Sequence, residues 1–434
     1  MRGAAVTVAL NGQINPLNPG GTESSVMSIV KHIGPLSDKI DLKFISLPAF
    51  SYTFTQIMQE GPEVIDWPYP MSAPVSNAVS SERWIKVRRR LGPTKLLFDY
   101  LVWLYRYIKA QRPLPSAAKC DALLGKYNID VVHFGWPGTF PTNLPYIYEP
   151  HDLQHRHYPE FFSKEVLRWR DKIYGPACLG AAFVVCGSWW TKRDIMKQYG
   201  VPSERIAVIP RSSVNARAEV SAERESEIVK EYRLSDSFGL YSAMTFAHKN
   251  HLRLIRAIRY LRDEMGIRVN LVCTGRVLKP VCDALEAEVK QAGLGDQVRF
   301  LGSVPGDVLT VIYKRAAMMV FPSLFEGLSQ SLLEGLASGL PIVGAHQSSI
   351  PETIGAAGML FDGEDVKSIA LTLAEAVRSP DKLAKISQVA KEEMRRYDWE
   401  RAAKTFQAVY RSAAKQSLSP EQVDLLALAT RMQP

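Results

Sequence analysis

The chain alternates between short apolar runs and longer amphipathic segments over most of its 434 residues. Several runs are continuously apolar, which is typical of strands that are covered on both faces in a parallel sheet. The predicted strands span residues 6–10, 42–47, 130–134, 146–149, 183–186, 239–242, 269–273, 298–301, 318–321 and 341–343. Helical periodicity lies between them, for example over residues 252–265, 280–292 and 399–415. This alternation predicts an α/β fold with doubly wound sheets.

The alternation pauses in a polar stretch between residues 211 and 237. We interpret this stretch as the passage between two Rossmann-like domains, which are expected to face each other across a cleft lined by the carboxyl ends of both sheets. The first domain is expected at residues 1–210 and the second at residues 211–395. Residues 396–434 are expected to form a helix that crosses back onto the first domain, followed by a tail.

Residues 50–115 do not follow the alternation and are expected to form a helical insertion in the first domain. A basic run at residues 82–91 holds Arg83, Lys86, Arg88, Arg89 and Arg90, and it precedes an aromatic helical pattern at residues 97–109 that holds Trp103. Basic side chains beside Trp and Tyr suit an anionic membrane surface. An inserted helical pair that packs on its own domain explains the same pattern, and both interpretations stay open.

The charge and the cysteines narrow the class of protein. The formal net charge is +9, which is either a modest surface excess or a sign of an anionic partner. No segment resembles a nucleic-acid-binding module, so a membrane surface is the better candidate for such a partner. Five cysteines without a Cys-x-x-Cys pair argue against a disulfide framework and a zinc knuckle. Without a signal-peptide pattern or a run of about 20 apolar residues, we predict a cytoplasmic protein, with peripheral association at the inner face of the membrane left open.

The strongest candidate for a ligand-binding motif spans residues 321–335. Glu326 is expected in a turn after a strand, and Glu334 inside a helix that starts near Ser329. A helix N-terminus attracts a diphosphate, and Gly327 lets the backbone approach a ligand closely. Two carboxylates placed before and within such a helix can bind sugar hydroxyls. Two bare glutamates at this spacing would otherwise be a cap and a solvated helix residue.

Two further patterns suit an anionic ligand. Lys249 follows the predicted strand at residues 239–242, where an ammonium group can neutralise a diphosphate and stabilise it as a leaving group. Gly20 and Gly21 follow the first strand and precede a helix, which permits a close approach of backbone to an anion; an ordinary turn is the alternative.

Other patterns point away from metals and redox cofactors. The string at residues 151–162 holds three histidines and an aspartate, but their spacing is not that of a zinc site. The chain has no Asp-x-Asp pair to chelate Mg²⁺ or Mn²⁺ on a nucleotide, and no Gly-x-Gly-x-x-Gly at its first strand. We therefore predict no metal and no cofactor.

The stretch at residues 321–335 resembles glycosyltransferase family 4, whose members are retaining enzymes of the GT-B architecture. The resemblance continues through residues 337–343, 350–352 and 358–361 and reaches Trp399-Glu400. It therefore covers nearly the whole C-terminal half. The resemblance implies two Rossmann-like domains and a nucleoside-diphosphate sugar as the donor substrate.

The resemblance also implies roles for single residues. Glu326 would contact the donor sugar near the reacting carbon, and Glu334 would bind the ribose hydroxyls. The backbone amides of Gly327, Leu328 and Ser329 would meet phosphate and sugar.

Further roles follow from the same resemblance. Lys249 matches the Lys-Asn step of the family, and His151 matches a histidine that faces the donor sugar. The loop with Gly20 and Gly21 would close over donor phosphate and acceptor. The longer string at residues 151–162 resembles bacterial mannosyltransferases and related enzymes of surface polysaccharides.

The sequence departs from the family at one position. Many members carry an arginine about six residues before the lysine, where Ala243 stands here. Either Arg211 or Arg276 could supply the missing cation.

These observations predict a retaining glycosyltransferase that moves a sugar to a hydroxyl acceptor, either a saccharide or a lipid-linked glycan. Two alternatives stay open: a nucleotide-sugar epimerase or hydrolase, and a catalytically silent nucleotide-sugar-binding scaffold.

Overall fold

The structure is a computed structural model, and it describes residues 5–14, 21–34, 40–58, 61–69, 114–213, 219–235 and 237–432. Gly20 and the basic and aromatic residues between positions 83 and 107 lie outside these ranges. Within the described ranges, no helix is both long enough and apolar enough to cross a bilayer.

The contacts among its residues divide the chain into two compact units. The first unit consists of Met1–Pro150, Phe162–Val184 and Gln407–Ser419. The second unit consists of His151–Phe161, Val185–Phe406 and Pro420–Pro434. The second unit thus includes two segments that come before residue 211, His151–Phe161 and the residues from Val185 onwards. The boundaries of independently folding domains stay a prediction.

Seven strands form the first sheet, in the order β3-β2-β1-β4-β5-β6-β7, and the pairs from β3 to β6 are parallel. The strands are β1 Val6–Asn11, β2 Ile40–Ser46, β3 Glu63–Asp66, β4 Val131–Phe134, β5 Tyr146–Tyr148, β6 Phe183–Cys186 and β7 Ile206–Val208. Among the described residues of this half, the helices are α1 Gly21–Ile33, α2 Ser51–Ile57, α5 Ala117–Gly125, α6 Gln154–His157, α7 Lys164–Gly180 and α8 Trp189–Tyr199, with short 3₁₀ turns η3 Pro159–Phe161 and η4 Ser203–Arg205.

Six parallel strands form the second sheet, in the order β10-β9-β8-β11-β12-β13. The strands are β8 Gly239–Ser242, β9 Leu271–Thr274, β10 Val298–Gly302, β11 Met318–Phe321, β12 Ile342–Ala345 and β13 Gly358–Phe361. The accompanying elements are α9 Ala222–Glu231, η5 Ala247–Lys249, α10 His251–Met265, α11 Lys279–Gln291, α12 Gly306–Arg315, α13 Gln330–Ala337, α14 Ile350–Ile354, α15 Val366–Arg378, α16 Pro380–Met394, α17 Trp399–Ala413 and α18 Pro420–Thr430.

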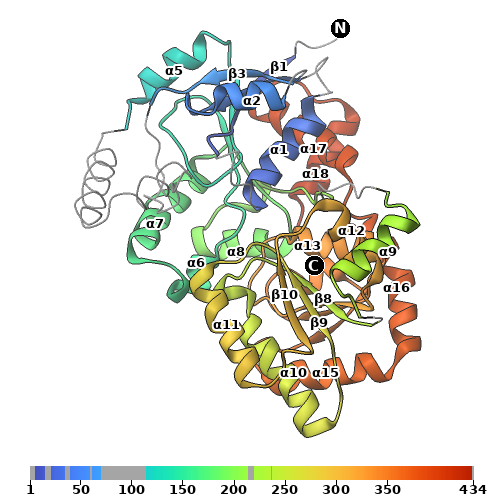
Figure 1. The fold of residues 1–434 in the computed structure, drawn as a ribbon. Helices are drawn as coiled ribbons and strands as arrows, with labels where there is room; N and C mark the ends of the chain where they lie inside the picture. Colours follow the sequence, from blue (N-terminus) through green and yellow to red (C-terminus); the bar gives the residue numbers. More distant parts are fainter. Residues whose placement is uncertain are drawn as a thin grey trace, which may run out of the picture. The chain divides into compact units, whose positions relative to one another are not determined.

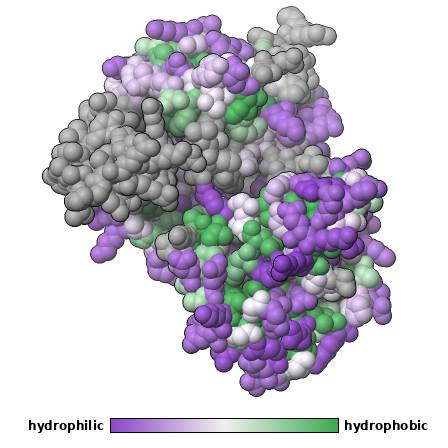
Figure 2. All heavy atoms as spheres, in the orientation of Figure 1, coloured by the Kyte–Doolittle hydropathy of each residue, from purple (hydrophilic) through white to green (hydrophobic). Residues whose placement is uncertain are grey.

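Helices cover the second sheet on both faces. In Figure 1, α10, α11 and α15 lie together on one side of β8, β9 and β10, and α9 and α12 lie on the other. The core between these layers is apolar and continuous, and β8, β11 and β12 are buried at every position. Hydrophilic residues cover most of the coloured surface on the face drawn in Figure 2. The predicted α/β class with parallel sheets is confirmed.

Each of the ten predicted strands corresponds to a strand of the structure, and the three helical patterns correspond to α10, α11 and α17. The sequence reasoning missed β3, β7 and β13, and all three lie at the edge of a sheet. The helix α17 contributes to both units, because its residues from Gln407 onwards belong to the first.

Candidate functional site

The second sheet changes direction between β8 and β11. The chain adds β9 and β10 on one side of β8 and then returns to add β11, β12 and β13 on the other. Loops that leave the carboxyl ends of β8 and β11 therefore diverge, and such a switch point is where open α/β sheets bind their ligands. Lys249 follows β8 and Glu326 follows β11, so both predicted residues reach this place.

Lys249 and Glu326 form an ion pair at the switch point. Lys249 Nζ lies 2.5 Å from Glu326 Oε1, and the two side chains are only 16% and 10% exposed. A charged pair in a partly enclosed position interacts more strongly than one in water. The two groups that sequence reasoning expected at an anionic ligand are thus held together, at an edge that solvent still reaches.

Backbone contacts fix the two loops that carry this pair. Asn250 adopts a left-handed conformation with φ 60°, and its Nδ2 donates to the carbonyl oxygens of Pro322 at 3.0 Å and Gly363 at 2.7 Å. The amide of Leu324 donates to the carbonyl oxygen of His248 at 2.8 Å. Asparagine tolerates the left-handed region better than most residues. The Lys-Asn step therefore sets the position of Lys249 relative to the β11–α13 loop (residues 322–329).

The backbone of Glu326 is held by the loop after β12. Its amide donates to Ser348 Oγ at 2.8 Å, and its carbonyl oxygen accepts a hydrogen bond from Ser349 Oγ at 2.8 Å. Neither serine was predicted from the sequence, since both lie in a stretch without a recognised motif. These two hydrogen bonds fix the backbone of Glu326, and its carboxylate remains available for the pair with Lys249.

Segments from the first half of the chain hold the next residues of the β11–α13 loop. Ser188 Oγ donates to the carbonyl oxygen of Gly327 at 2.8 Å, and a Cβ atom at Gly327 would collide with the carbonyl oxygen of His151. Leu328 packs on Gly187, where a Cβ atom would also meet it closely. His151 itself has a left-handed backbone with φ 62°. The glycine at position 327 is therefore required for close packing against His151.

The helix α13 begins directly after this loop, as expected. Ser329 is buried and is the N-cap residue, but its side chain makes no capping hydrogen bond. The first amides of a helix have no partner within the helix and carry a partial positive charge. The start of α13 thus presents backbone donors near Glu326.

Glu334 lies on the buried face of α13. Its Oε2 accepts a hydrogen bond from the hydroxyl of Tyr313 at 2.8 Å, and its Oε1 lies 3.5 Å from Ser213 Oγ. Burial of a carboxylate is costly unless it is hydrogen-bonded. Tyr313 and Ser213 thus hold this carboxylate next to the start of the polar stretch at residues 211–237.

Arg211 and Arg276, the two candidates for the arginine that many family members carry at the position of Ala243, have different surroundings. Arg211 is buried, with its guanidinium 5.5 Å from the ring centroid of Phe406. The carbonyl oxygen of Arg276 accepts a hydrogen bond from the amide of Thr245 at 3.3 Å, and Gly275, with φ 119°, allows the backbone to pack on Ala243. Arg276 therefore stands beside the position that lacks the arginine.

The N-terminal glycines are only partly covered by the structure. Gly21 is the first residue of α1, so the expected helix after the glycine pair is present. Gly20 lies outside the described residues. The contribution of this loop to the site stays a prediction.

Two buried groups behind Lys249 have strongly shifted pKa values. The Tyr241 hydroxyl donates to the carbonyl oxygen of Lys249 at 2.7 Å, and burial raises the pKa of Tyr241 well above its usual value. The ring centroid of His251 lies 4.6 Å from that of Tyr241, with the two rings tilted by 39°. Burial, together with the charges of Lys249 and His248, lowers the pKa of His251 to about 3. Within the described ranges, neither ring nitrogen of His251 has a hydrogen-bond partner. The histidine is therefore neutral, and Lys249 faces no competing positive charge from it.

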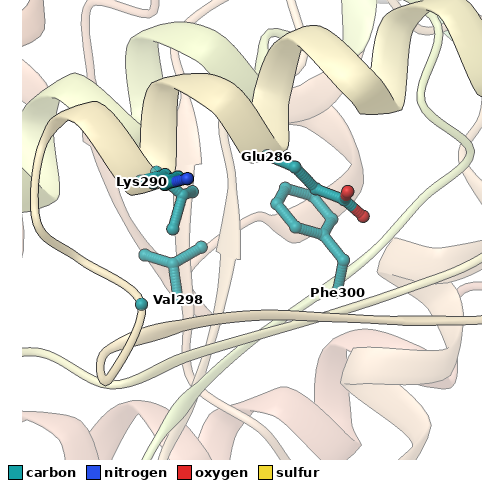
Figure 3. A pocket seen from close by; sticks show the side chains of 6 residues that line it. Glu286, Lys290, Val298 and Phe300 are labelled. Carbon is teal, nitrogen blue, oxygen red and sulfur yellow. The ribbon is translucent and has the colours of Figure 1, made fainter.

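A cavity of about 350 Å³ lies elsewhere, between α11 and the edge strand β10. Figure 3 shows Glu286 and Lys290 of α11 above Val298 and Phe300 of β10. The residues that line it are Glu286, Val289, Lys290, Gly295, Val298 and Phe300. None of the predicted site residues is among them. The described part of the chain also holds no cluster of three or more His, Cys, Asp or Glu side chains suited to a metal ion.

Comparison with known families agrees with this geometry. The family described as Glycosyl transferases group 1 matches residues 224–393, which include both Lys249 and Glu326. The family described as Glycosyltransferase Family 4 matches residues 87–212. The chain belongs to glycosyltransferase family 4. Between them the two matches cover well over half of this glycosyltransferase, so the resemblance found in the C-terminal half extends into the N-terminal half.

Individual relatives are distant from this glycosyltransferase. It is 26% identical over 230 residues to the O-antigen chain mannosyltransferase B of Escherichia coli, a match that covers 52% of this chain and 60% of the relative. The match thus spans less than two thirds of the relative's length.

Solved structures share the fold at low identity. A glycosyltransferase from Rickettsia africae has a TM-score of 0.67 at 15% identity, and the match covers 95% of this chain and all of that one. HepE of Anabaena, solved in complex with UDP and glucose, has a TM-score of 0.63 at 17% identity and covers 94% of this chain. At this identity the likeness concerns the fold alone, and it supports the GT-B class.

Proposed function

We propose that this protein is a retaining glycosyltransferase that transfers a sugar from a nucleoside-diphosphate sugar to a hydroxyl group of an acceptor. The observation that carries the proposal is the Lys249–Glu326 pair at the switch point of the second sheet, directly before α13. Membership of glycosyltransferase family 4 supports the same conclusion.

The chemistry of the pair suits the departure of a nucleoside diphosphate. The ammonium of Lys249 and the first amides of α13 offset the charge that develops on the leaving phosphate. A diphosphate competes with Glu326 for Lys249, which frees the carboxylate to bind the donor sugar near its reacting carbon. In this proposal His151 faces the same sugar and Glu334 binds the ribose.

Retention of the anomeric configuration follows in this proposal if the acceptor attacks from the face that the leaving group vacates. The bond from the anomeric carbon to the β-phosphate oxygen breaks as the acceptor oxygen approaches. The β-phosphate oxygen takes the acceptor proton, so no side chain is required as a base. Lys249 acts by its charge and takes no part in this proton transfer.

The relatives suggest the donor to test first. The E. coli relative is named a mannosyltransferase of O-antigen chains, which supports GDP-mannose and a role in surface polysaccharide synthesis. The proposed acceptor is a saccharide or a lipid-linked glycan. A cytoplasmic location with peripheral binding to anionic lipid is proposed from the sequence of residues 83–107.

Incubation of the purified protein with GDP-mannose, UDP-glucose, UDP-GlcNAc and dTDP-rhamnose tests the proposal. We expect one donor to be consumed faster when a saccharide acceptor is present, and proton NMR to show an α-linked product from an α-linked donor. Donor hydrolysis or epimerisation at the same rate without acceptor would assign the protein to those activities. Binding without turnover of any donor would identify a scaffold.

A further inference from the structure

Three rings surround Phe325, the buried residue that precedes Glu326 in the chain. The ring centroid of Phe325 lies 5.0 Å from that of His157, 5.2 Å from that of Trp190 and 6.2 Å from that of Tyr158. His157 and Tyr158 belong to the 151–161 segment, and Trp190 belongs to α8. Residues distant in sequence thus hold the side chain next to Glu326.

His157 is the ring of this cluster with a fixed polar contact. Its Nε2 lies 2.9 Å from both carboxylate oxygens of Asp194, a buried residue of α8. A hydrogen bond to a buried carboxylate restricts the orientation of an imidazole ring. The face that His157 presents to Phe325 is therefore set by Asp194.

The helix that carries Asp194 is itself firmly held. The two carboxylate oxygens of Glu352 accept hydrogen bonds from the amides of Trp189 at 2.7 Å and Trp190 at 2.8 Å, at the N-terminus of α8. Ser188 both caps α8 and donates to Gly327. The helix α8 thus serves as a support from which His157 and the β11–α13 loop are both fixed.

Small displacements of Glu326 matter for the proposed reaction. Its backbone is fixed by Ser348 and Ser349, but the direction of its side chain also depends on the preceding residue. A misplacement of about 1 Å can cost a large part of a reaction rate. Phe325 shares a peptide bond with Glu326, so packing on Phe325 bears on the path of the backbone from which the Glu326 side chain reaches Lys249.

We propose that His157, oriented by Asp194, is a positioning residue: its ring packs on Phe325 and thereby keeps Glu326 directed at Lys249 and the reacting sugar. The inference rests on the proposed function. The inference assigns a role to a second histidine of residues 151–162, in addition to that of His151. His157 acts through Phe325 and not by contact with the substrate.

Steady-state kinetics of four variants test this, with the donor that the wild type turns over. His157→Ala is expected to lower kcat about tenfold, with the donor KM and the Kd of the nucleoside diphosphate product within about twofold of wild type. Asp194→Ala is expected to lower kcat selectively as well, but by less, because the ring of His157 stays in place. The double variant is expected to be no slower than His157→Ala alone, because coupled residues are not additive. His157→Phe keeps a ring and is expected to retain more of kcat than His157→Ala.

His155→Ala is the matched control. His155 lies in the same helix α6 and is buried, but its ring lies 3.3 Å from the Tyr199 hydroxyl rather than against Phe325. Its loss is expected to lower Tm while kcat is retained. A His157→Ala variant with wild-type kcat, additive losses, or an equal kcat loss in His155→Ala would each overturn the inference. A wild type that turns over no donor would overturn the proposed function and the inference together.

Discussion

A pair of ionisable side chains lies at the carboxyl end of each sheet, and the two pairs differ in their exposure to solvent. His133 of β4 lies 3.0 Å from Glu149, which follows β5, and both side chains are sealed, at 0% and 1% exposed. The hydroxyl of Tyr410 from α17 lies 2.7 Å from the other ring nitrogen of His133. Lys249 and Glu326 are instead 16% and 10% exposed and stand before the start of α13.

The difference separates a structural pair from a functional one. The sealed pair fastens the last part of α17 within the first unit, because the hydroxyl of Tyr410 contacts a ring nitrogen of His133. A pair at the edge of the sheet can exchange one partner for a ligand. Burial and charge alone would have selected both pairs, so position at a switch point and access to solvent are the deciding features.

Removal of either member of the second pair should have the largest effect. Lys249→Ala and Glu326→Ala are each expected to lower kcat on the order of a hundredfold, as for other groups that stabilise developing charge. Both variants should keep the wild-type Tm within a few degrees, because both side chains line an open edge. Turnover and thermal unfolding measure the two effects. Wild-type turnover by either variant would remove the site assignment.

The neutral state of His251, beside Lys249, should make the folded protein less stable at acidic pH. The pKa of His251 is lowered from 6.5 to about 3 in the folded protein, so its contribution to stability is intact above pH 6.5 and is lost as pH falls towards 3. At pH 5 the loss is on the order of 2 kcal/mol. His251→Phe should therefore lose less stability than wild type between pH 7.5 and pH 5 in urea unfolding. Equal losses in the two proteins would contradict the neutral state.

The sealed pair should affect stability without affecting turnover. Tyr410→Phe removes the hydroxyl that contacts His133 and should lower the free energy of unfolding by about 1 kcal/mol. Because this network belongs to the first unit and both Lys249 and Glu326 belong to the second, kcat should stay at the wild-type value. Urea unfolding and turnover of the same preparation measure both quantities. A loss of kcat with unchanged stability would mean that the two pairs are not distinct in kind.

Glu334 should act on binding. Glu334→Ala is expected to raise the donor KM about fivefold with little change in kcat, since a ribose contact is equally strong in ground and transition states. Tyr313→Phe is the control, because it removes a protein partner of Glu334 and leaves the carboxylate in place. A loss of kcat at unchanged donor KM would argue against a ribose contact.

Chelation should have the smallest effect. If Lys249 and the backbone amides of α13 offset the negative charge of the diphosphate without a metal ion, EDTA should leave turnover unchanged. The assay is a comparison of initial rates in EDTA and in Mg²⁺ or Mn²⁺. An activity that EDTA abolishes and Mn²⁺ restores would require a different account of the leaving group.

The interior strands of both sheets could be predicted from the sequence, whereas three of the four edge strands could not. Strands such as Met318–Phe321 are buried throughout and therefore read as continuous apolar runs. The missed strands β3, β7 and β13 are edge strands. β3 has one fully buried position among its four residues, so it shows no continuous apolar run. A strand of this kind carries too little pattern to distinguish it from a loop.

The site divides in a similar way. Lys249 and Glu326 could be predicted to meet, because motifs mark the carboxyl ends of two strands that a doubly wound sheet places side by side. The residues that hold them could not, because Ser188, Ser348 and Asp194 belong to separate stretches and are ordinary in sequence. Their contacts arise only from tertiary packing.

The support of the β11–α13 loop has a consequence for protein engineering. A chimaera that replaces residues 211–395 with those of another family member would import a new loop but leave behind Ser188, His151 and His157, on which the present loop rests. Such hybrids should express as folded proteins with poorly aligned carboxylates. Exchanging His151–Phe161 and Val185–Phe406 together would transplant the loop with its own scaffold. The useful unit of recombination in this chain is therefore discontinuous.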